Sequence, residues 1–156
     1  MQASKGLNTL AANKALLRRY KTGILNARDP EALGEVAAVD YLDHAAFPEQ
    51  APGLEGLKQR ARMLWQALDP HWVIDDVVAE DDMVVLRWHL SGRHMGDFAG
   101  VAATGRPCVI HGIDMYRVSD GQMAEHWNAV DIYGFLQQVA PQVPGPTATP
   151  PQARPI

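Results

Sequence analysis

Residues 111–131, HGIDMYRVSDGQMAEHWNAVD, have the pattern of two β-strands joined by a tight turn. Asp120 and Gly121 are the turn signal, with Gly121 suited to the positive φ angle that such turns need. Side chains in a strand alternate between two faces, so residues two apart share a face. A turn at this position predicts that Asp114 lies directly opposite His126.

One face of this hairpin is predicted to combine ionisable, polar and apolar groups. Asp114 and His126 would share it with Gly112, Tyr116 and Asn128. A hairpin with one solvated face would alternate simply between polar and apolar residues. The mixed pattern therefore indicates a cavity that contains a few placed ionisable groups.

The sequence around the hairpin has the composition of one globular domain. The chain has 156 residues, of which 47% are hydrophobic and 21% charged. Its net charge is only −4 and its basic residues are scattered, so we expect no nucleic-acid partner. No apolar run approaches the ~20 residues of a membrane helix, and the start of the chain lacks signal-peptide features. Cys108, the single cysteine, excludes an internal disulfide, and we expect a cytoplasmic protein.

The first seventy residues show helical periodicity. Apolar residues recur at helical spacing over 16–25, and Lys21 falls mostly off that face. Asp29-Pro30-Glu31 predicts the start of a short helix, and residues 41–47 an irregular segment that crosses the cavity mouth. Apolar residues at helical spacing predict a third amphipathic helix over 57–68, and Pro70 sets its end.

After Pro70 the period changes to two. We expect strands at 72–78, 83–91, 106–118 and 122–131, followed by a helical turn at 132–139. Helices first and an antiparallel sheet afterwards indicate an α+β domain with helices on one face of a curved sheet. Residues 1–140 form this single domain, and the proline-rich residues 141–156 are predicted to be a poorly structured tail.

Several segments in order resemble the SnoaL-like polyketide cyclases, a family of the nuclear transport factor 2-like superfamily. They are NKALLRRY (13–20), LNARD (25–29), DYLDH (40–44), GLEGLK (53–58), GRHMGDFAG (92–100), TGR (104–106), HGIDMYR (111–117) and DGQMAEHW (120–127). The resemblance implies a cone-shaped domain with three helices around a curved, mostly antiparallel sheet, an interior pocket, and commonly a dimer through the outer sheet face. It also implies acid–base chemistry without a cofactor, such as ring closure by intramolecular aldol condensation of a polyketide-like ligand. The same resemblance places the catalytic acid near Asn128, whereas this chain has its carboxylate at Asp114.

We predict Asp114 and His126 as the catalytic pair, with Asp114 as the general acid/base and His126 as the residue that tunes it. An acid between Ile113 and Met115 that faces a pocket should have a raised pKa and could move a carbon-bound proton near neutral pH. The structural alternative is a carboxylate satisfied by Arg117 or a backbone amide. For His126, the alternative is a buried histidine that ties the sheet together.

Further residues are predicted to contact the substrate. They are Tyr20, His44, Trp65, Tyr116, Trp127, Asn128 and Asp131, with Tyr116 and Asn128 as donors to an enolate oxygen. Asp131 could instead cap the helix that follows, and the aromatic residues could belong to the core. No metal is expected, since no short ligand spacing is present.

Two functions from different classes fit these residues. The first is a cofactor-independent cyclase or isomerase that acts on a small apolar carbonyl compound, and the second is a non-catalytic protein that binds a hydrophobic ligand. An ionisable pair favours the enzyme, because burying charge without chemical use costs stability. We also predict a homodimer through the convex sheet face, from Trp88 among Val84, Leu86 and Leu90.

Overall fold

The computed structural model describes residues 2–142. The helical elements are α1 (Gln2–Arg18), the π-helix η1 (Arg19–Ile24), α2 (Leu25–Ala27), the 3₁₀ helix η2 (Glu31–Glu35), α3 (Gly53–Leu68) and α4 (Ile132–Val139). The strands are β1 (Ala37–Asp43), β2 (His71–Glu80), β3 (Met83–Arg93), β4 (Pro107–Ser119) and β5 (Gln122–Val130). Of the predicted tail, residues 143–156 lie outside the described part of the chain.

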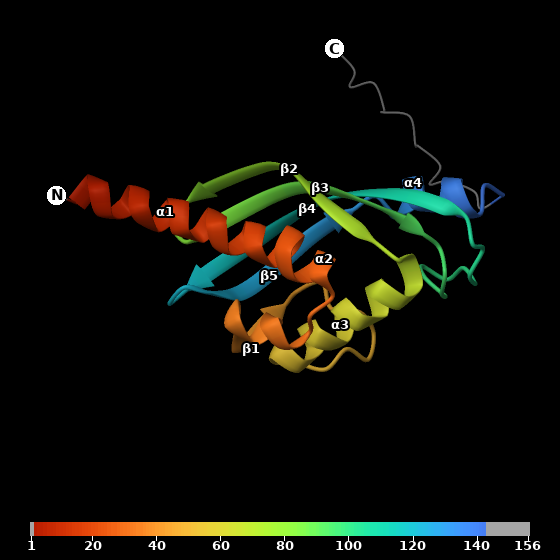
Figure 1. Ribbon diagram of the computed structural model, residues 1–156, viewed down its shortest axis with the longest axis horizontal. Helices are drawn as coiled ribbons and strands as arrows, with labels where there is room; N and C mark the ends of the chain where they lie inside the picture. The colour runs from red at the N-terminus through yellow and green to blue at the C-terminus, as the bar shows by residue number, and fades with distance from the viewer. Residues whose placement is uncertain (1, 143–156) are drawn as a thin grey trace, which may run out of the picture.

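The strands form one sheet in the order β1-β5-β4-β3-β2. All neighbours are antiparallel except β1 and β5, which pair in parallel, so the prediction of an α+β domain with a mostly antiparallel sheet is confirmed. Figure 1 shows α1 running along the sheet, with α3 below it and α4 at the far end. The core lies between these helices and the inner sheet face, where Leu86, Trp88 and Ile110 are buried.

The segment before α3 differs from its prediction. Residues 37–43 are a strand, β1, although 41–47 was expected to be irregular. The pairing of β1 with β5 joins residues about 80 positions apart, and short-range periodicity carries no signal for such a contact. Asp29 begins the preceding helix as expected, since its Oδ1 accepts hydrogen bonds from the backbone N–H groups of Glu31 and Ala32.

The register of the central hairpin also differs. Asp114 pairs with Asn128 and Tyr116 with His126, so the expected Asp114–His126 pairing is wrong by two residues. A bulge between Arg117 and Val118 absorbs the extra residue, and Asp120 and Gly121 both have positive φ in the turn. Because the error is an even number of residues, the predicted shared face survives.

The outer sheet face is made by different apolar residues from those predicted. Val84, Leu86, Trp88 and Leu90 are all buried on the inner face, so they give no reason for a dimer. The exposed large apolar side chains of β2 and β4 include Val73, Val109, Ile113 and Met115.

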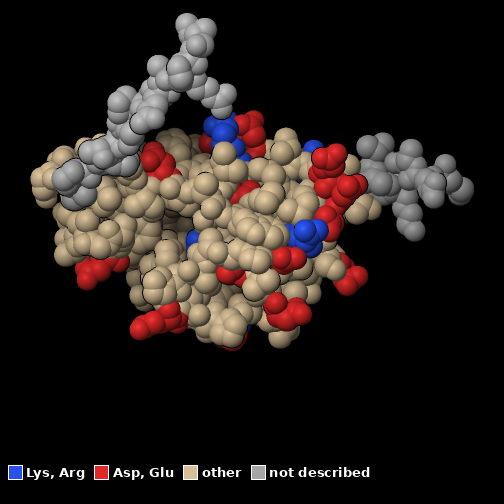
Figure 2. Space-filling view, turned by 180° about the vertical axis from the view of Figure 1, so that it is seen from behind, with Lys and Arg blue, Asp and Glu red and all other residues tan. Residues whose placement is uncertain are grey.

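In the view of Figure 2, Lys and Arg side chains do not gather into one patch. None of the helices in residues 2–142 is long and apolar enough to cross a membrane.

Candidate active site

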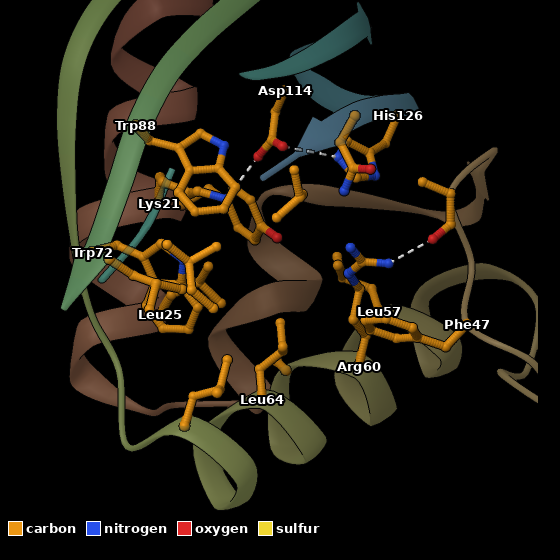
Figure 3. Close-up of a pocket in the computed structure, with 18 of the residues that line it drawn as sticks. Lys21, Leu25, Phe47, Leu57, Arg60, Leu64, Trp72, Trp88, Asp114 and His126 are labelled. Carbon is orange, nitrogen blue, oxygen red and sulfur yellow. Dashed lines mark hydrogen bonds and ion pairs between the residues drawn. The ribbon is translucent and has the colours of Figure 1, made fainter. Parts of the chain in front are cut away.

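A cavity of about 240 Å³ lies between the inner sheet face, η1 and α3. Its walls are mostly apolar, and Figure 3 shows Lys21 beside Trp88, Asp114 and His126 above the cavity, and Arg60 beside Phe47. The apolar and aromatic lining residues include Leu25, Phe47, Leu57, Leu64, Leu68, Trp72, Trp88, Leu90, Phe98, Ile110 and Val130. The polar lining residues are Tyr20, Lys21, Arg60, Asp114, Tyr116, His126 and Asn128. An apolar cavity with a few convergent polar groups is the usual form of a small-molecule site.

Lys21 and Asp114 form a buried ion pair in this cavity. Lys21 Nζ lies 2.6 Å from Asp114 Oδ2, and the two residues are 5% and 1% exposed. Lys21 reaches inward because it lies in the π-helix η1, where Tyr20, Lys21 and Ile24 are all buried. Such widened turns interrupt α-helices frequently at functional sites. The expectation that Lys21 lies off the buried face is therefore wrong.

This ion pair reverses the expected ionisation of Asp114. Burial alone would raise the pKa of Asp114, but the Lys21 ammonium and the neighbouring His126 outweigh it and hold that pKa below its usual range. Burial in turn lowers the pKa of Lys21, although Asp114 opposes the shift. Asp114 is therefore an ionised carboxylate at neutral pH, and the prediction of a raised pKa is wrong.

His126 lies between two carboxylates. Its Nδ1 is 2.9 Å from Asp43 Oδ1, and its Nε2 is 3.6 Å from Asp114 Oδ1. Neither Nε2 nor Asp114 Oδ1 has a hydrogen-bond partner within residues 2–142, and both atoms are buried. His126 and Asp114 therefore present two unsatisfied polar atoms at the cavity wall.

Asp43 determines which nitrogen of His126 carries the proton. Burial would raise the pKa of Asp43, but His126, Arg60 and Gln50 lower it to about 2. An ionised carboxylate only accepts hydrogen bonds, so the nitrogen facing it, Nδ1, must be the N–H donor. In neutral His126 the lone pair is then on Nε2, the atom that faces Asp114 and the cavity.

Arg60 supplies a second cation at the cavity wall. Its Nη1 donates to the Ala45 carbonyl oxygen at 2.8 Å and lies 3.4 Å from Asp43 Oδ2. The guanidinium carbon lies over the Phe47 ring, 4.4 Å from its centre, which is a cation–π contact. Arginine has five N–H donors, so further donors are available for a ligand oxygen.

Three of the predicted substrate contacts line the cavity. These are Tyr20, Tyr116 and Asn128. The Tyr116 hydroxyl donates to Asp114 Oδ2 at 2.9 Å, so it supports the carboxylate rather than an enolate oxygen. Burial and the Asp114 charge raise the pKa of Tyr116 well above its usual value, which keeps the phenol protonated. Asn128 also lines the cavity, so its side-chain amide can contact a ligand there.

The other four predicted contacts lie away from the cavity. Trp65 is a core residue whose Nε1 donates to the Leu25 carbonyl oxygen at 2.8 Å. His44 stacks on Trp127 with ring centroids 4.5 Å apart and contacts Glu125 Oε2 at 2.9 Å. Asp131 caps α4, accepting from the Gly134 N–H at 2.7 Å. We therefore assign no ligand contact to these four residues.

Lys21, Asp43 and Arg60 were missed by the sequence analysis. A helix read at 3.6 residues per turn places Lys21 outside, because the π-helix has no simple sequence signature. The sequence analysis named His44 as a substrate contact and not its neighbour Asp43, because strand alternation was not expected in that segment. One signal was available: a buried carboxylate at Asp114 requires a cation, and the first helix is rich in lysine and arginine.

Among the described residues, no cluster of three or more His, Cys, Asp or Glu side chains could hold a metal ion.

The sequence and the fold have counterparts among known proteins. A sequence model of the family described as SnoaL-like polyketide cyclase matches residues 14–139. Aklanonic acid methyl ester cyclase DnrD from Streptomyces peucetius is 26% identical over 138 residues, which cover 85% of this chain and 91% of the relative. The structure of TsrD from Streptomyces laurentii has a TM-score of 0.76 at 29% identity, covering 83% of this chain and 96% of that one. IdmH from Streptomyces antibioticus has a TM-score of 0.65 at 30% identity, with coverage of 75% and 91%.

Proposed function

Since this chain belongs to the SnoaL-like polyketide cyclase family, we propose that it closes a ring in a polyketide-like carbonyl compound by an intramolecular aldol reaction. The catalytic residue in this proposal is His126, with Asp114 and Asp43 as the carboxylates on either side of it. The observation that carries the proposal is Nε2 of His126, which lies at the wall of an apolar cavity and has no hydrogen-bond partner in the part of the chain that the structure describes. A positioned imidazole is the commonest general base in enzymes.

Ring closure by this route needs one proton carrier and no co-reactant. His126 Nε2 removes a proton from the carbon beside a ketone, and the C–H electron pair moves onto the ketone oxygen as an enolate. The enolate carbon then bonds to a second carbonyl carbon of the same molecule, whose π electrons become an alkoxide. The alkoxide takes the proton back from Nε2–H, so the product is an isomer of the substrate and His126 is neutral again.

The charges of the site suit the intermediate of this reaction. Before proton transfer, Lys21 and Arg60 balance Asp43 and Asp114. After it, the new imidazolium lies between the two carboxylates while the enolate carries the compensating negative charge. The Arg60 guanidinium and the Asn128 amide, which both line the cavity, are the donors we assign to the enolate oxygen.

The alternative is a non-catalytic protein that holds a hydrophobic ligand in the same cavity. Two observations favour it: the lining is largely apolar, and Asn128 occupies the place where the resemblance puts an acid. Aklanonic acid methyl ester, the compound in the name of the relative, is a suitable probe for choosing between the two. A cyclase converts it to a product of equal mass and different retention time, whereas a binding protein returns it unchanged.

We further propose that two chains associate through the outer sheet face. Ile113 and Met115 are 49% and 37% exposed there, and Met115 pairs with Trp127 of β5.

Light scattering should give about 34 kDa for this dimer, twice the 17.1 kDa of one chain. I113K should shift the mass toward the monomer, because a lysine would be desolvated in the contact. Val39 on β1 is 83% exposed, so V39K is the matched control and should stay dimeric. A dimeric I113K would contradict this assignment.

A further inference from the structure

The indole N–H of Trp88 has no role in the chemistry proposed above. Trp88 lines the cavity, and its Nε1 is buried without a hydrogen-bond partner among the described residues. The buried indole of Trp65 behaves differently, since it donates to the Leu25 carbonyl oxygen at 2.8 Å. Buried indole N–H groups normally find an acceptor. An acceptor for Trp88 is therefore to be sought in the ligand.

The Trp88 indole occupies space that is open because Gly112 has no side chain. The two residues are paired across β3 and β4. A Cβ atom at Gly112 would lie 2.3 Å from Trp88 Cζ2 and 2.7 Å from Cε2, the carbon bonded to Nε1. Gly112 thus leaves the space in which the indole lies across β4, two residues from Asp114. Any other residue at 112 would have to displace the donor.

The charge around the indole selects a neutral acceptor. Lys21 Nζ lies 4.2 Å from the centre of the Trp88 ring, and its positive charge strengthens the N–H dipole. Asp114 already neutralises that ammonium, and its free Oδ1 would repel a ligand carboxylate. Figure 3 shows Trp88 and Trp72 on one side of the cavity and His126 on the other, with Asp114 above the space between them.

We propose that Trp88 Nε1 donates a hydrogen bond to a neutral carbonyl oxygen of a flat, largely apolar ligand, and that Gly112 determines this specificity. The inference rests on the proposed function in that the ligand occupies the same cavity. In that cavity the carbonyl would be anchored by Trp88 while the rings lie against the apolar walls. A ligand that lacks the oxygen would leave the N–H unsatisfied.

A pair of probes that differ in one atom tests the donor without requiring turnover. 2-Acetylnaphthalene has a carbonyl oxygen where 2-isopropenylnaphthalene has a CH₂ group. We expect wild-type protein to bind the ketone about tenfold more tightly by titration calorimetry, as one hydrogen bond implies. W88F keeps an aromatic ring and loses the donor, so its preference should fall to about one. W72F, which changes the other indole near Lys21, should keep the tenfold ratio.

The indole resonances give an independent measurement on the unaltered protein. The chain has four tryptophans, and one indole N–H resonance should move downfield with the ketone and stay in place with the alkene. That measurement decides the matter if W88F does not fold. Equal affinity for the two probes, no binding of the ketone, or an unchanged ratio in W88F would each overturn the proposal. Loss of ring closure with the ketone preference intact would instead count against the proposed reaction alone.

Discussion

H126N should lower kcat for ring closure by about 10²- to 10⁴-fold, the usual contribution of a positioned general acid–base group. Asparagine places an N–H close to the position of the imidazole Nδ1, so the hydrogen bond to Asp43 can be kept. It has no counterpart of Nε2, the atom that faces Asp114 Oδ1 at 3.6 Å. We therefore expect a loss in kcat with KM nearly unchanged, measured by chromatography of the cyclised product.

A second histidine provides the control for this substitution. His111 lies on the same hairpin, exposed on the outer face, where it neighbours His89. H111N should keep wild-type kcat because that side chain does not reach the cavity. A kcat for H126N within about threefold of wild type would show that the proton carrier is another group.

K21M should lower the free energy of unfolding by about 3–5 kcal/mol at pH 7, the cost of removing one partner of a buried ion pair. Methionine fills much the same volume, so the loss comes from Asp114, which stays buried without its cation. The double variant K21M/D114L removes both charges and should regain most of the stability while losing activity. Urea denaturation of the two variants and wild type measures both effects, and a K21M loss below about 1 kcal/mol would contradict the account.

The effect of K21M should also depend on pH. In wild type the folded pKa of Asp114 lies below the unfolded value of about 3.9, so this group stabilises the fold above that pH. That contribution is lost as the pH falls through the folded pKa. Without Lys21, burial is the main influence on Asp114 and raises its folded pKa, so protonation relieves the buried charge of K21M at a higher pH than in wild type. The stability difference between wild type and K21M should therefore shrink as the pH is lowered from 7 towards 4.

Local patterns were enough to predict most of the fold. The strands after Pro70 alternate with a period of two, and the capping groups of Asp29 and Asp131 are short-range features. The parallel pairing of β1 with β5 was missed because it depends on residues distant in sequence. The hairpin register was wrong by two because the position of the bulge depends on backbone geometry that the turn residues alone do not fix.

The site was predicted only where it lies on the hairpin. Alternation placed Asp114, Tyr116, His126 and Asn128 on one face, and all four line the cavity. The groups that give them their chemistry come from elsewhere: Lys21 from a π-helix, Asp43 from an unpredicted strand and Arg60 from α3. No spacing in the sequence connects these residues, and the sign of the pKa shift of Asp114 depends on one of them.

The most direct test of the account is whether His126 removes a carbon-bound proton in the cavity. 2,6-Diacetylnaphthalene can place one carbonyl at Trp88 and the methyl protons beside the other at His126, and its rigid rings hold the two carbonyls too far apart for ring closure, so the chemistry stops after proton removal. In D₂O, NMR should show that wild-type protein exchanges these protons for deuterium faster than buffer does, and that H126N returns the rate to that of buffer. Exchange by H126N at the wild-type rate, or no acceleration by wild type, would contradict proton transfer at His126.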